Sequence, residues 1–240
     1  MQSLPLSGRT ALVTGASRGI GRAVASALVA AGAQICLVSR SRTDLDTFAA
    51  ELGPLASAHP ADVTDAAAVQ RLMAEVAAQT QGGPDILVNN AGVFSMAPLD
   101  ATDPETFAHT LQANVLAPFR LLRACLPAMK ARGAGHVVTI GSVADRHIFG
   151  GNGAYSASKY GARAMHEVLR SETAGSGVRA TLVAPAATDT SIWDPVDPDN
   201  TPGFPPRSAM LRAADVADAV LWAVTRPASV NIDELRISRS

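Results

Sequence analysis

Tyr155 and Lys159 stand four residues apart in a stretch, 153–174, that has helical periodicity. Side chains four apart on a helix share one face, so the Lys159 ammonium would lie beside the Tyr155 hydroxyl. Positive charge next to a phenol favours loss of its proton, which lets the hydroxyl exchange a proton near neutral pH. Ser142 ends the strand-like run GHVVTIGS, where its hydroxyl could polarise a carbonyl. Taken singly, such residues are usually surface contacts or turn residues, so their weight depends on the elements around them.

A second set of residues could hold phosphate groups. The first strand-like run, 10–15, leads through TGASRGIG (14–21) directly into a helical pattern. Glycines in such a turn let the main chain approach a pyrophosphate closely, and N–H groups at the helix start supply the positive end. The spacing Gly-x-x-x-Gly-x-Gly differs from the commoner Gly-x-Gly-x-x-Gly, and a glycine turn alone could be structural. Its place directly after the first strand favours a nucleotide site.

The end of the second strand-like run, 34–39, bears on which dinucleotide would fit. An acid there would accept hydrogen bonds from the ribose 2′-hydroxyl and would repel a 2′-phosphate. This chain has Ser39 and Arg40 instead, and a guanidinium forms charge-assisted bonds to phosphate. Arg18 in the glycine turn could approach the same group. These residues predict NADP(H) over NAD(H), unless Arg40 is simply a solvated charge at a strand end.

The elements that must position these residues alternate along the chain. Apolar or β-branched runs predict strands at 10–15, 34–39, 56–63, 85–91, 135–142, 179–185 and 234–238. Longer Ala-rich stretches predict helices at about 19–31, 42–52, 65–80, 104–131, 153–174 and 213–225. Most strands are apolar on both faces, as a parallel sheet covered on both sides requires. The alternation predicts an α/β fold: one doubly wound parallel sheet of about seven strands with helices on both faces, in a single domain spanning 1–240.

Composition narrows the class of partner. The net charge is −1 and the basic residues are scattered, which indicates a small-molecule partner rather than nucleic acid or a membrane surface. Cys36 and Cys125 lie in apolar runs and are expected to be reduced core residues. The five histidines lack metal-ligand spacing, so no metal site is expected. No signal-peptide pattern or run of 18 apolar residues occurs, and we expect a cytoplasmic protein.

The substrate side would be formed by loops at about 92–98, 143–152 and 188–207. Five prolines in 194–206 (DPVDPDNTPGFPP) exclude a regular helix or central strand there. Because this segment follows the sixth strand, we expect a Pro-rich loop that covers the substrate. Five residues of these loops could form apolar walls or could instead fill the core: Phe94, Phe149, Ile192, Trp193 and Phe204. His147 could border the substrate, although a polar loop residue is the simpler interpretation.

Several motifs together resemble the short-chain dehydrogenase/reductase family. TGASRGIG (14–21), NNAG (89–92), Ser142 and YSASK (155–159) follow the family's order and approximate spacing, from about Arg9 to the last predicted strand. The resemblance implies a Rossmann-like domain with Asn114, Ser142, Tyr155 and Lys159 at catalytic positions, Asn114 belonging to a proton relay. The full set of expected cofactor-binding residues is Thr14, Gly15, Ser17, Arg18, Gly19, Ile20, Gly21, Ser39, Arg40, Asp62, Val63, Asn90, Ala91, Gly92, Tyr155, Lys159, Pro185, Thr188 and Thr190.

The resemblance also implies an activity and an assembly. It is typical of an enzyme that interconverts a carbonyl and a secondary alcohol by hydride transfer with NADP(H), here a ketone or 3-oxoacyl reductase. An oxidative NAD(P)-dependent alcohol dehydrogenase and a non-catalytic NADP(H)-sensing protein are the alternatives. Similar proteins are homodimers or homotetramers joined through their two long helices, here about 104–131 and 153–174. One departure is Ala186 after Pro185, where the family usually has glycine, and we expect local adjustment there rather than loss of binding.

Overall fold

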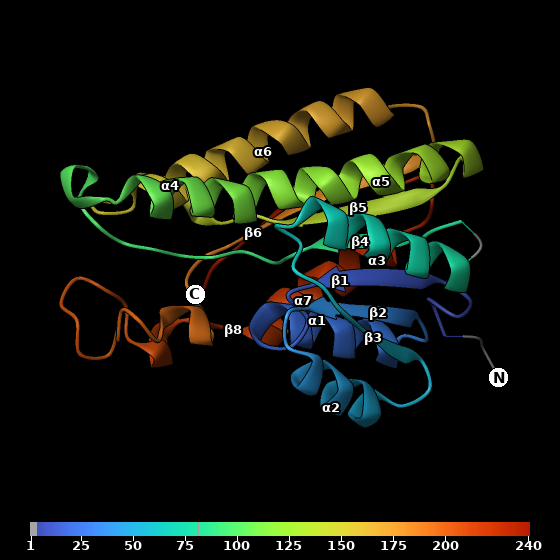
Figure 1. The fold of residues 1–240 in the computed structure, drawn as a ribbon, viewed down its shortest axis with the longest axis horizontal. Helices are drawn as coiled ribbons and strands as arrows, with labels where there is room; N and C mark the ends of the chain where they lie inside the picture. Colours follow the sequence, from blue (N-terminus) through green and yellow to red (C-terminus); the bar gives the residue numbers. More distant parts are fainter. Residues whose placement is uncertain (1–3, 81) are drawn as a thin grey trace.

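The computed structural model describes residues 4–80 and 82–240 and contains one seven-stranded parallel sheet (Figure 1). Residues 1–3 of the N-terminal stretch that we searched for a leader lie outside the described residues. The strands, in their spatial order, are β3 (Ala56–Pro60), β2 (Gln34–Ser39), β1 (Thr10–Thr14), β4 (Ile86–Asn89), β5 (Gly135–Ile140), β6 (Val178–Pro185) and β9 (Glu234–Ile237). All neighbouring strands in this sheet pair in parallel. The predicted fold class is therefore confirmed.

Helices cover both faces of the sheet, as Figure 1 shows. One face carries α1 (Gly19–Ala30), α2 (Arg42–Leu52) and α7 (Ala213–Val224), and the other carries α3 (Ala66–Gln79), α4 (Pro104–Leu111), α5 (Ala117–Arg132) and α6 (Gly153–Thr173). Each face has its own buried aliphatic cluster, because the central strands are apolar on alternate sides. Leu12 and Val13 of β1, for example, belong to opposite clusters. Both clusters hold the sheet rigid beneath the carboxyl ends of its strands.

The strand order reverses direction between β1 and β4, which opens a crevice at their carboxyl ends. Thr14, the last residue of β1, joins the two strands there. Its buried hydroxyl donates to the carbonyl of Val88 at 3.2 Å and accepts the N–H groups of Asn90 and Ala91, each at 3.0 Å. The loop after β4 is thus fixed beside the glycine turn after β1.

The helix predicted over about 104–131 is present, but it is not one regular α-helix, because a π-helical segment, Gln112–Leu116, separates α4 from α5. Pro118 supplies a physical reason. It has no N–H, so it cannot bond to the carbonyl of Asn114 as an α-helix requires. The N–H of Ala117 bonds instead to the carbonyl of Gln112, five residues back. The helical spacing of apolar residues continues through the π-helical segment, so the sequence pattern does not reveal this wider turn.

The Pro-rich segment 194–206 contains neither helix nor strand, as predicted. The chain on either side of it forms two short strands, β7 (Thr188–Asp189) and β8 (Leu211–Arg212), which pair in parallel and which the sequence patterns did not predict. Short 3-10 turns occur at Leu99–Ala101, Val143–Asp145, Ser191–Trp193 and Arg207–Ala209. The segment projects beyond the carboxyl edge of the sheet, in orange at the left of Figure 1. Its two ends are therefore held together at the mouth of the crevice.

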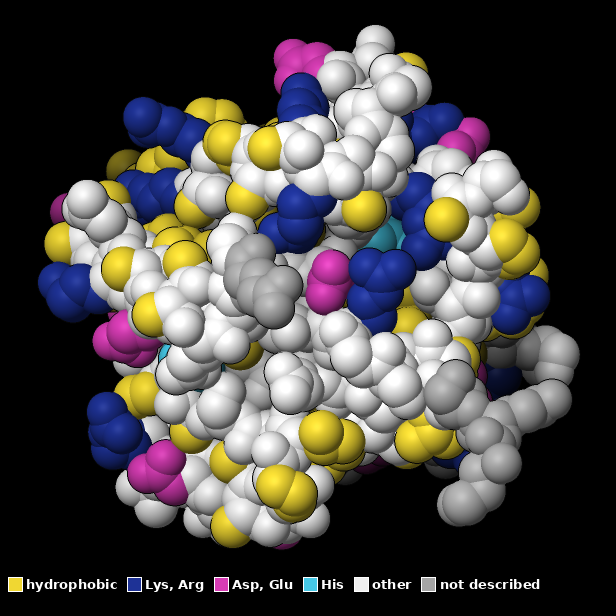
Figure 2. All heavy atoms as spheres, turned by 90° about the vertical axis from the view of Figure 1, so that its right-hand side faces the viewer, with side chains coloured by type: hydrophobic (Ala, Val, Ile, Leu, Met, Phe, Trp, Pro, Cys, Tyr) yellow, Lys and Arg dark blue, Asp and Glu magenta, His cyan; other side chains and the backbone are white. Residues whose placement is uncertain are grey.

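The opposite end of the molecule, viewed in Figure 2, shows basic, acidic and apolar side chains interspersed. No single-sign patch dominates this face. Within residues 4–80 and 82–240, no helix has the length and apolar character needed to span a bilayer.

Two histidines are buried against the sheet, on its opposite faces. His136 of β5 and His166 of α6 expose only 2% and 1% of their surfaces. One nitrogen of each ring pairs with a threonine hydroxyl, Nε2 of His136 with Thr181 at 2.8 Å and Nδ1 of His166 with Thr139 at 3.0 Å. Burial lowers the pKa of His136 to about 3 and that of His166 to about 4, and the charges of Arg179 and Arg170 act in the same direction. Both rings are therefore neutral in the folded protein near pH 7.

We expect the free energy of unfolding to fall as the pH is lowered below about 6.5, the ordinary histidine pKa. Below this pH the unfolded chain binds protons that the folded chain does not, so stability present above it is lost. Each histidine should remove about 2 kcal/mol between pH 7 and pH 5, measured by urea denaturation. His166→Asn keeps a nitrogen near Thr139 and should reduce this loss by about 2 kcal/mol. An identical pH dependence in the variant would contradict the assignment.

Candidate active site

A cavity of about 1290 Å³ lies at the carboxyl ends of the strands. Its walls come from the glycine turn after β1, the end of β2, and the loops that follow β3, β4, β5 and β6. It exceeds the 300–1,000 Å³ typical of small-molecule sites. The cavity therefore offers space for two ligands side by side, such as a dinucleotide and a substrate.

The glycine turn forms the floor of one half of this cavity. Gly15 and Gly19 have φ angles of +65° and +56°, which side chains with a Cβ adopt only with strain. A Cβ on Gly21 would collide with the carbonyl oxygen of Gly15. Helix α1 begins at Gly19 without a side-chain cap, so its first N–H groups are free to bind an anion. The turn fits a pyrophosphate.

The far end of this half carries a mixed set of charged groups. Arg18 and Arg40 line the cavity, and neither forms an ion pair with a residue that the structure describes. Asp62 accepts the hydroxyl of Thr64 at 2.7 Å and its N–H at 2.9 Å, and the hydroxyl bond is the main cause of a lowered Asp62 pKa. Asp62 is held ionised, while the two guanidinium groups remain available to a phosphate.

Ser142, Tyr155 and Lys159 face the same cavity. Ser142 follows β5, and its Oγ accepts the N–H of Ala144 at 3.1 Å, which leaves the hydroxyl hydrogen free to donate to a ligand. The Nζ of Lys159 donates to the carbonyl of Ile140, the last residue of β5, at 3.1 Å. The same Nζ lies 5.5 Å from the ring centre of Tyr155. One strand end and one helix turn thus bring all three side chains together.

Three predicted site residues do not line the cavity. Thr14 and Gly21 lie behind the glycine turn, the first joining β1 to β4 and the second packing against Gly15. Asn114 is buried in the π-helical segment, where its side chain accepts the N–H of Val93 at 2.8 Å and donates to the hydroxyl of Ser158 at 2.9 Å. Asn114 therefore couples the loop after β4 to α6 from outside the cavity.

The other predicted cofactor residues all line the cavity: Gly15, Ser17, Arg18, Gly19, Ile20, Ser39, Arg40, Asp62, Val63, Asn90, Ala91, Gly92, Tyr155, Lys159, Pro185, Thr188 and Thr190. Ala186 lies among them, and its N–H donates to the carbonyl of Ile237 at 2.9 Å. Asp197 is the one described residue other than glycine with a positive φ. Ala186 thus fits its place without the left-handed backbone that would require glycine.

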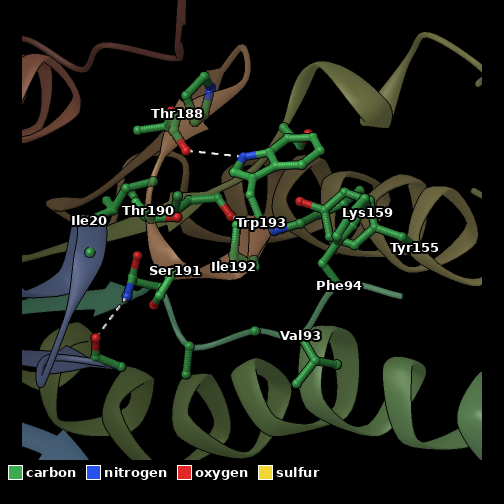
Figure 3. Close-up of a pocket in the computed structure, with 18 of the residues that line it drawn as sticks. Ile20, Val93, Phe94, Tyr155, Lys159, Thr188, Thr190, Ser191, Ile192 and Trp193 are labelled. Carbon is green, nitrogen blue, oxygen red and sulfur yellow. Dashed lines mark hydrogen bonds between the residues drawn. The ribbon is translucent and has the colours of Figure 1, made fainter. Parts of the chain in front are cut away.

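The second half of the cavity has aromatic walls (Figure 3). Phe94 packs edge-on against Tyr155, with ring centres 4.9 Å apart, and lies 5.1 Å from Trp193. The ring centres of Trp193 and Phe204 are 6.0 Å apart. The indole N–H of Trp193 donates to the carbonyl of Thr188 at 3.1 Å. Phe149 and Ile192 complete the set of apolar loop residues that we predicted could line a pocket.

His147, which we considered as a possible neighbour of the substrate, does not line the cavity, whereas some residues that we did not predict do. His147 is exposed and away from the cavity, consistent with a polar loop residue. His109, Ile148 and Arg239 do line it. His109 comes from α4 and Arg239 from the chain after β9, so no local motif could have indicated either of them. Ile148 precedes the predicted Phe149 in a largely polar loop. An aliphatic residue at such a position could have indicated a ligand site.

Arg207 holds the Pro-rich segment in place over the cavity. Its guanidinium bonds to Asp189 at 2.8 Å, to Asp194 at 2.6 Å and to the carbonyl of Thr190 at 3.0 Å, and it lies 4.0 Å from Asp199. These partners stand on both sides of Trp193. One side chain thus fixes the curvature of the segment that carries the indole.

Residues 9–201 match the family model described as short chain dehydrogenase. The chain belongs to the short-chain dehydrogenase/reductase family. A glycine betaine reductase from Emericella nidulans is 38% identical over 239 residues, which cover 97% of this chain but only 19% of that protein. A metagenomic short-chain oxidoreductase solved with NADP has 33% identity and a TM-score of 0.85, with 98% of this chain and 99% of that chain covered. An alcohol dehydrogenase from Thermococcus sibiricus, complexed with 5-hydroxy-NADP, has 30% identity and a TM-score of 0.85 with 95% of each chain covered.

Membership in this family makes the chain an oxidoreductase whose fold binds a nicotinamide cofactor. The glycine turn and its open helix start fit such a group. Among the described residues, no cluster of three or more His, Cys, Asp or Glu side chains could hold a metal ion.

Replacing Arg207 should loosen the Pro-rich segment without disturbing the cofactor half. We expect Arg207→Gln to raise the substrate KM several-fold and to speed limited proteolysis within 194–206, while the Kd for NADPH stays unchanged. Arg212→Gln is the matched control, because Arg212 pairs with Asp215 alone on the surface. Equal proteolysis rates in the two variants would show that Arg207 does not hold the segment.

Proposed function

We propose that this enzyme reduces a ketone or 3-oxoacyl carbonyl to a secondary alcohol with NADPH. The observation that carries the proposal is the convergence of Ser142, Tyr155 and Lys159 on one cavity beside an anion-binding glycine turn. A strand end and a helix supply these groups, so their positions are fixed by the sheet rather than by flexible loops.

Each side chain has a distinct task in this reaction. A bound reduced nicotinamide supplies the hydride that the carbonyl carbon gains. Ser142 donates its hydroxyl hydrogen to the carbonyl oxygen and polarises the double bond, since its Oγ is already oriented by Ala144. Tyr155 transfers its hydroxyl proton to that oxygen, which completes the alcohol. Lys159, held by the carbonyl of Ile140, binds the cofactor ribose and places positive charge beside the phenolate that remains.

A preference for NADP(H) over NAD(H) is part of the proposal. Arg40 follows β2 directly and Arg18 lies in the glycine turn after β1; both line the cavity, and no acidic residue stands at the end of β2 itself. Two solved relatives, the metagenomic oxidoreductase and the Thermococcus sibiricus enzyme, carry NADP or 5-hydroxy-NADP. Paired guanidinium groups favour a 2′-phosphate over a hydroxyl.

Oxidation of an alcohol with NADP⁺ is the second candidate, favoured by the likeness to the Thermococcus sibiricus alcohol dehydrogenase. The same residues serve both directions, because Tyr155 then accepts the proton that it otherwise donates. Binding alone requires no positioned proton donor, which argues against a non-catalytic NADP(H) sensor.

We also propose that copies of the chain associate through α5 and α6 as a homodimer or homotetramer. Both helices expose large apolar side chains: Leu116 just before α5, Phe119 within it, and Tyr160 and Val168 in α6. Contacts between two copies would cover this surface. The cytoplasmic location stays a prediction.

The role of Tyr155 is tested by removing its hydroxyl alone. We expect Tyr155→Phe to lower kcat for NADPH-dependent ketone reduction by about 10²–10⁴-fold, the usual contribution of a general acid, with NADPH binding retained. Tyr160→Phe alters the chain's other tyrosine, which is exposed on the same helix, and should leave the rate unchanged. Turnover retained in Tyr155→Phe would exclude Tyr155 as the proton donor.

Cofactor preference is tested by reversing one charge. Arg40→Asp should lower the ratio of kcat/KM for NADPH to that for NADH by at least about tenfold, since an acid repels the 2′-phosphate and accepts the 2′-hydroxyl. Arg42→Asp is the control, because Arg42 is exposed nearby but does not line the cavity. An unchanged ratio in Arg40→Asp would assign Arg40 to the solvated surface.

A further inference from the structure

We infer that the substrate is a neutral, apolar ketone with an aromatic or alicyclic body, and not an anionic, cationic or polyhydroxylated carbonyl compound. This inference rests on the proposed reductase function and narrows its substrate class. Three independent features of the substrate half carry it: the packing of its rings, the apolar rim of its mouth and the charge of the segment above it.

The ring packing forms a wall with little room for an ion between its members. Phe94, Trp193 and Phe204 follow one another at 5.1 and 6.0 Å between ring centres, at steep mutual angles. Rings this close contact each other, so they do not surround an ammonium group as the separated walls of an aromatic cage would. The wall starts at Tyr155, where Phe94 packs edge-on at 4.9 Å. An apolar body extending from the reacting carbonyl would therefore lie along aromatic surface.

The mouth of the cavity is apolar where solvent reaches it. Ile148 and Phe149 are 76% and 50% exposed, and Ile192 and Met96 are 37% and 36% exposed. All four line the cavity, on loops that follow β4, β5 and β6. Exposed apolar side chains gathered around one opening are typical of a ligand site, because the ligand removes them from water. A hydrocarbon body would be stabilised by this rim, and a hydroxyl-rich one would not.

The net charge of the segment 188–207 disfavours an anion. The segment 188–207 contains four aspartates, Asp189, Asp194, Asp197 and Asp199, against a single basic residue, Arg207. Arg207 is engaged by three of these carboxylates. None of these aspartates lines the cavity, so the net negative charge of the segment would act on an entering carboxylate or phosphate at longer range.

Among the described residues, one further guanidinium lines the cavity besides Arg18 and Arg40, and main-chain carbonyls engage it. No described carboxylate pairs with Arg239, and its Nη1 donates to the carbonyls of Ser208 and Met210, which leaves that nitrogen unavailable to a ligand. Arg18 and Arg40 belong to the far end of the cofactor half, and Lys159 is held at Ile140. A buried carboxylate without a partner is strongly disfavoured. Thioesters on phosphorylated carriers are accordingly less favoured than simple ketones.

A matched series of ketones tests the inference directly. We expect kcat/KM with NADPH for a phenyl alkyl ketone to exceed, by at least tenfold, the values for its para-carboxylate, its para-trimethylammonium derivative and a polyhydroxy ketone. Equal or higher values for any of the three charged or hydroxylated compounds would overturn the inference.

A charge placed at the rim should change this preference. Ile148→Arg adds a cation at a highly exposed position, and we expect it to raise the ratio of kcat/KM for the carboxylate ketone to that for the neutral ketone at least tenfold. Val230→Arg is the control, since Val230 is exposed but does not line the cavity, and its ratio should match the wild type. The same ratio in Ile148→Arg as in Val230→Arg would overturn the assignment of Ile148 to the substrate mouth.

Binding can be followed without turnover, which separates this inference from the proposed function. The chain has two tryptophans, and Trp222 lies exposed on α7, so a Tyr155→Phe, Trp222→Phe variant reports fluorescence from Trp193 alone. With NADP⁺ bound, the neutral ketone should change this fluorescence at lower concentration than its charged analogues. Such a response, together with no reduction of the same ketones by the wild-type enzyme and NADPH, would overturn the reductase proposal and support the substrate class. The absence of any response to neutral ketones would overturn the substrate class.

Discussion

The hydroxyl of Thr14 joins the two halves of the sheet at the point where the strand order reverses. It bonds to three backbone groups, one within β4 and two after it, and so connects the glycine turn directly to the Asn90–Gly92 loop. A crevice between two strands would otherwise widen or close with small shifts of the sheet. Fixing it from below leaves the turn's N–H groups free for a ligand. Thr14 thus supports the site although it does not line the cavity.

From this fixed crevice the cavity divides into two environments. One half offers backbone N–H groups and guanidinium groups, which suit phosphates. The other offers aromatic and aliphatic side chains under an acidic segment. Ser142, Tyr155 and Lys159 stand at their boundary, where a hydride donor and a carbonyl would meet. This contrast between the halves would favour a phosphate-bearing ligand in one and an apolar ligand in the other.

Much of this arrangement could be predicted from short-range patterns. The Tyr155–Lys159 spacing, the glycine turn and the strand-end Arg40 each depend on residues close together in sequence, and parallel strands bring such ends to one edge. What the sequence could not reveal depends on long-range geometry. Arg239 reaches the cavity from the C-terminal end, and Arg207 meets Asp189 across 18 residues of loop. The π-helical segment was not predicted, because Pro118 alters a backbone hydrogen bond without interrupting the helical spacing of apolar residues.

That π-helical segment has a consequence for how the surface of the protein can change. One additional residue in a helical turn rotates everything beyond it by about 100°, so α4 and α5 share a backbone but do not share a face. His109 of α4 reaches the cavity, whereas Phe119 of α5 points to solvent. Substitutions that adapt α4 to ligands would thereby be uncoupled from those that adapt α5 to the neighbouring copy that we propose. If copies associate as proposed, ligand binding and assembly can evolve separately along this single stretch of chain.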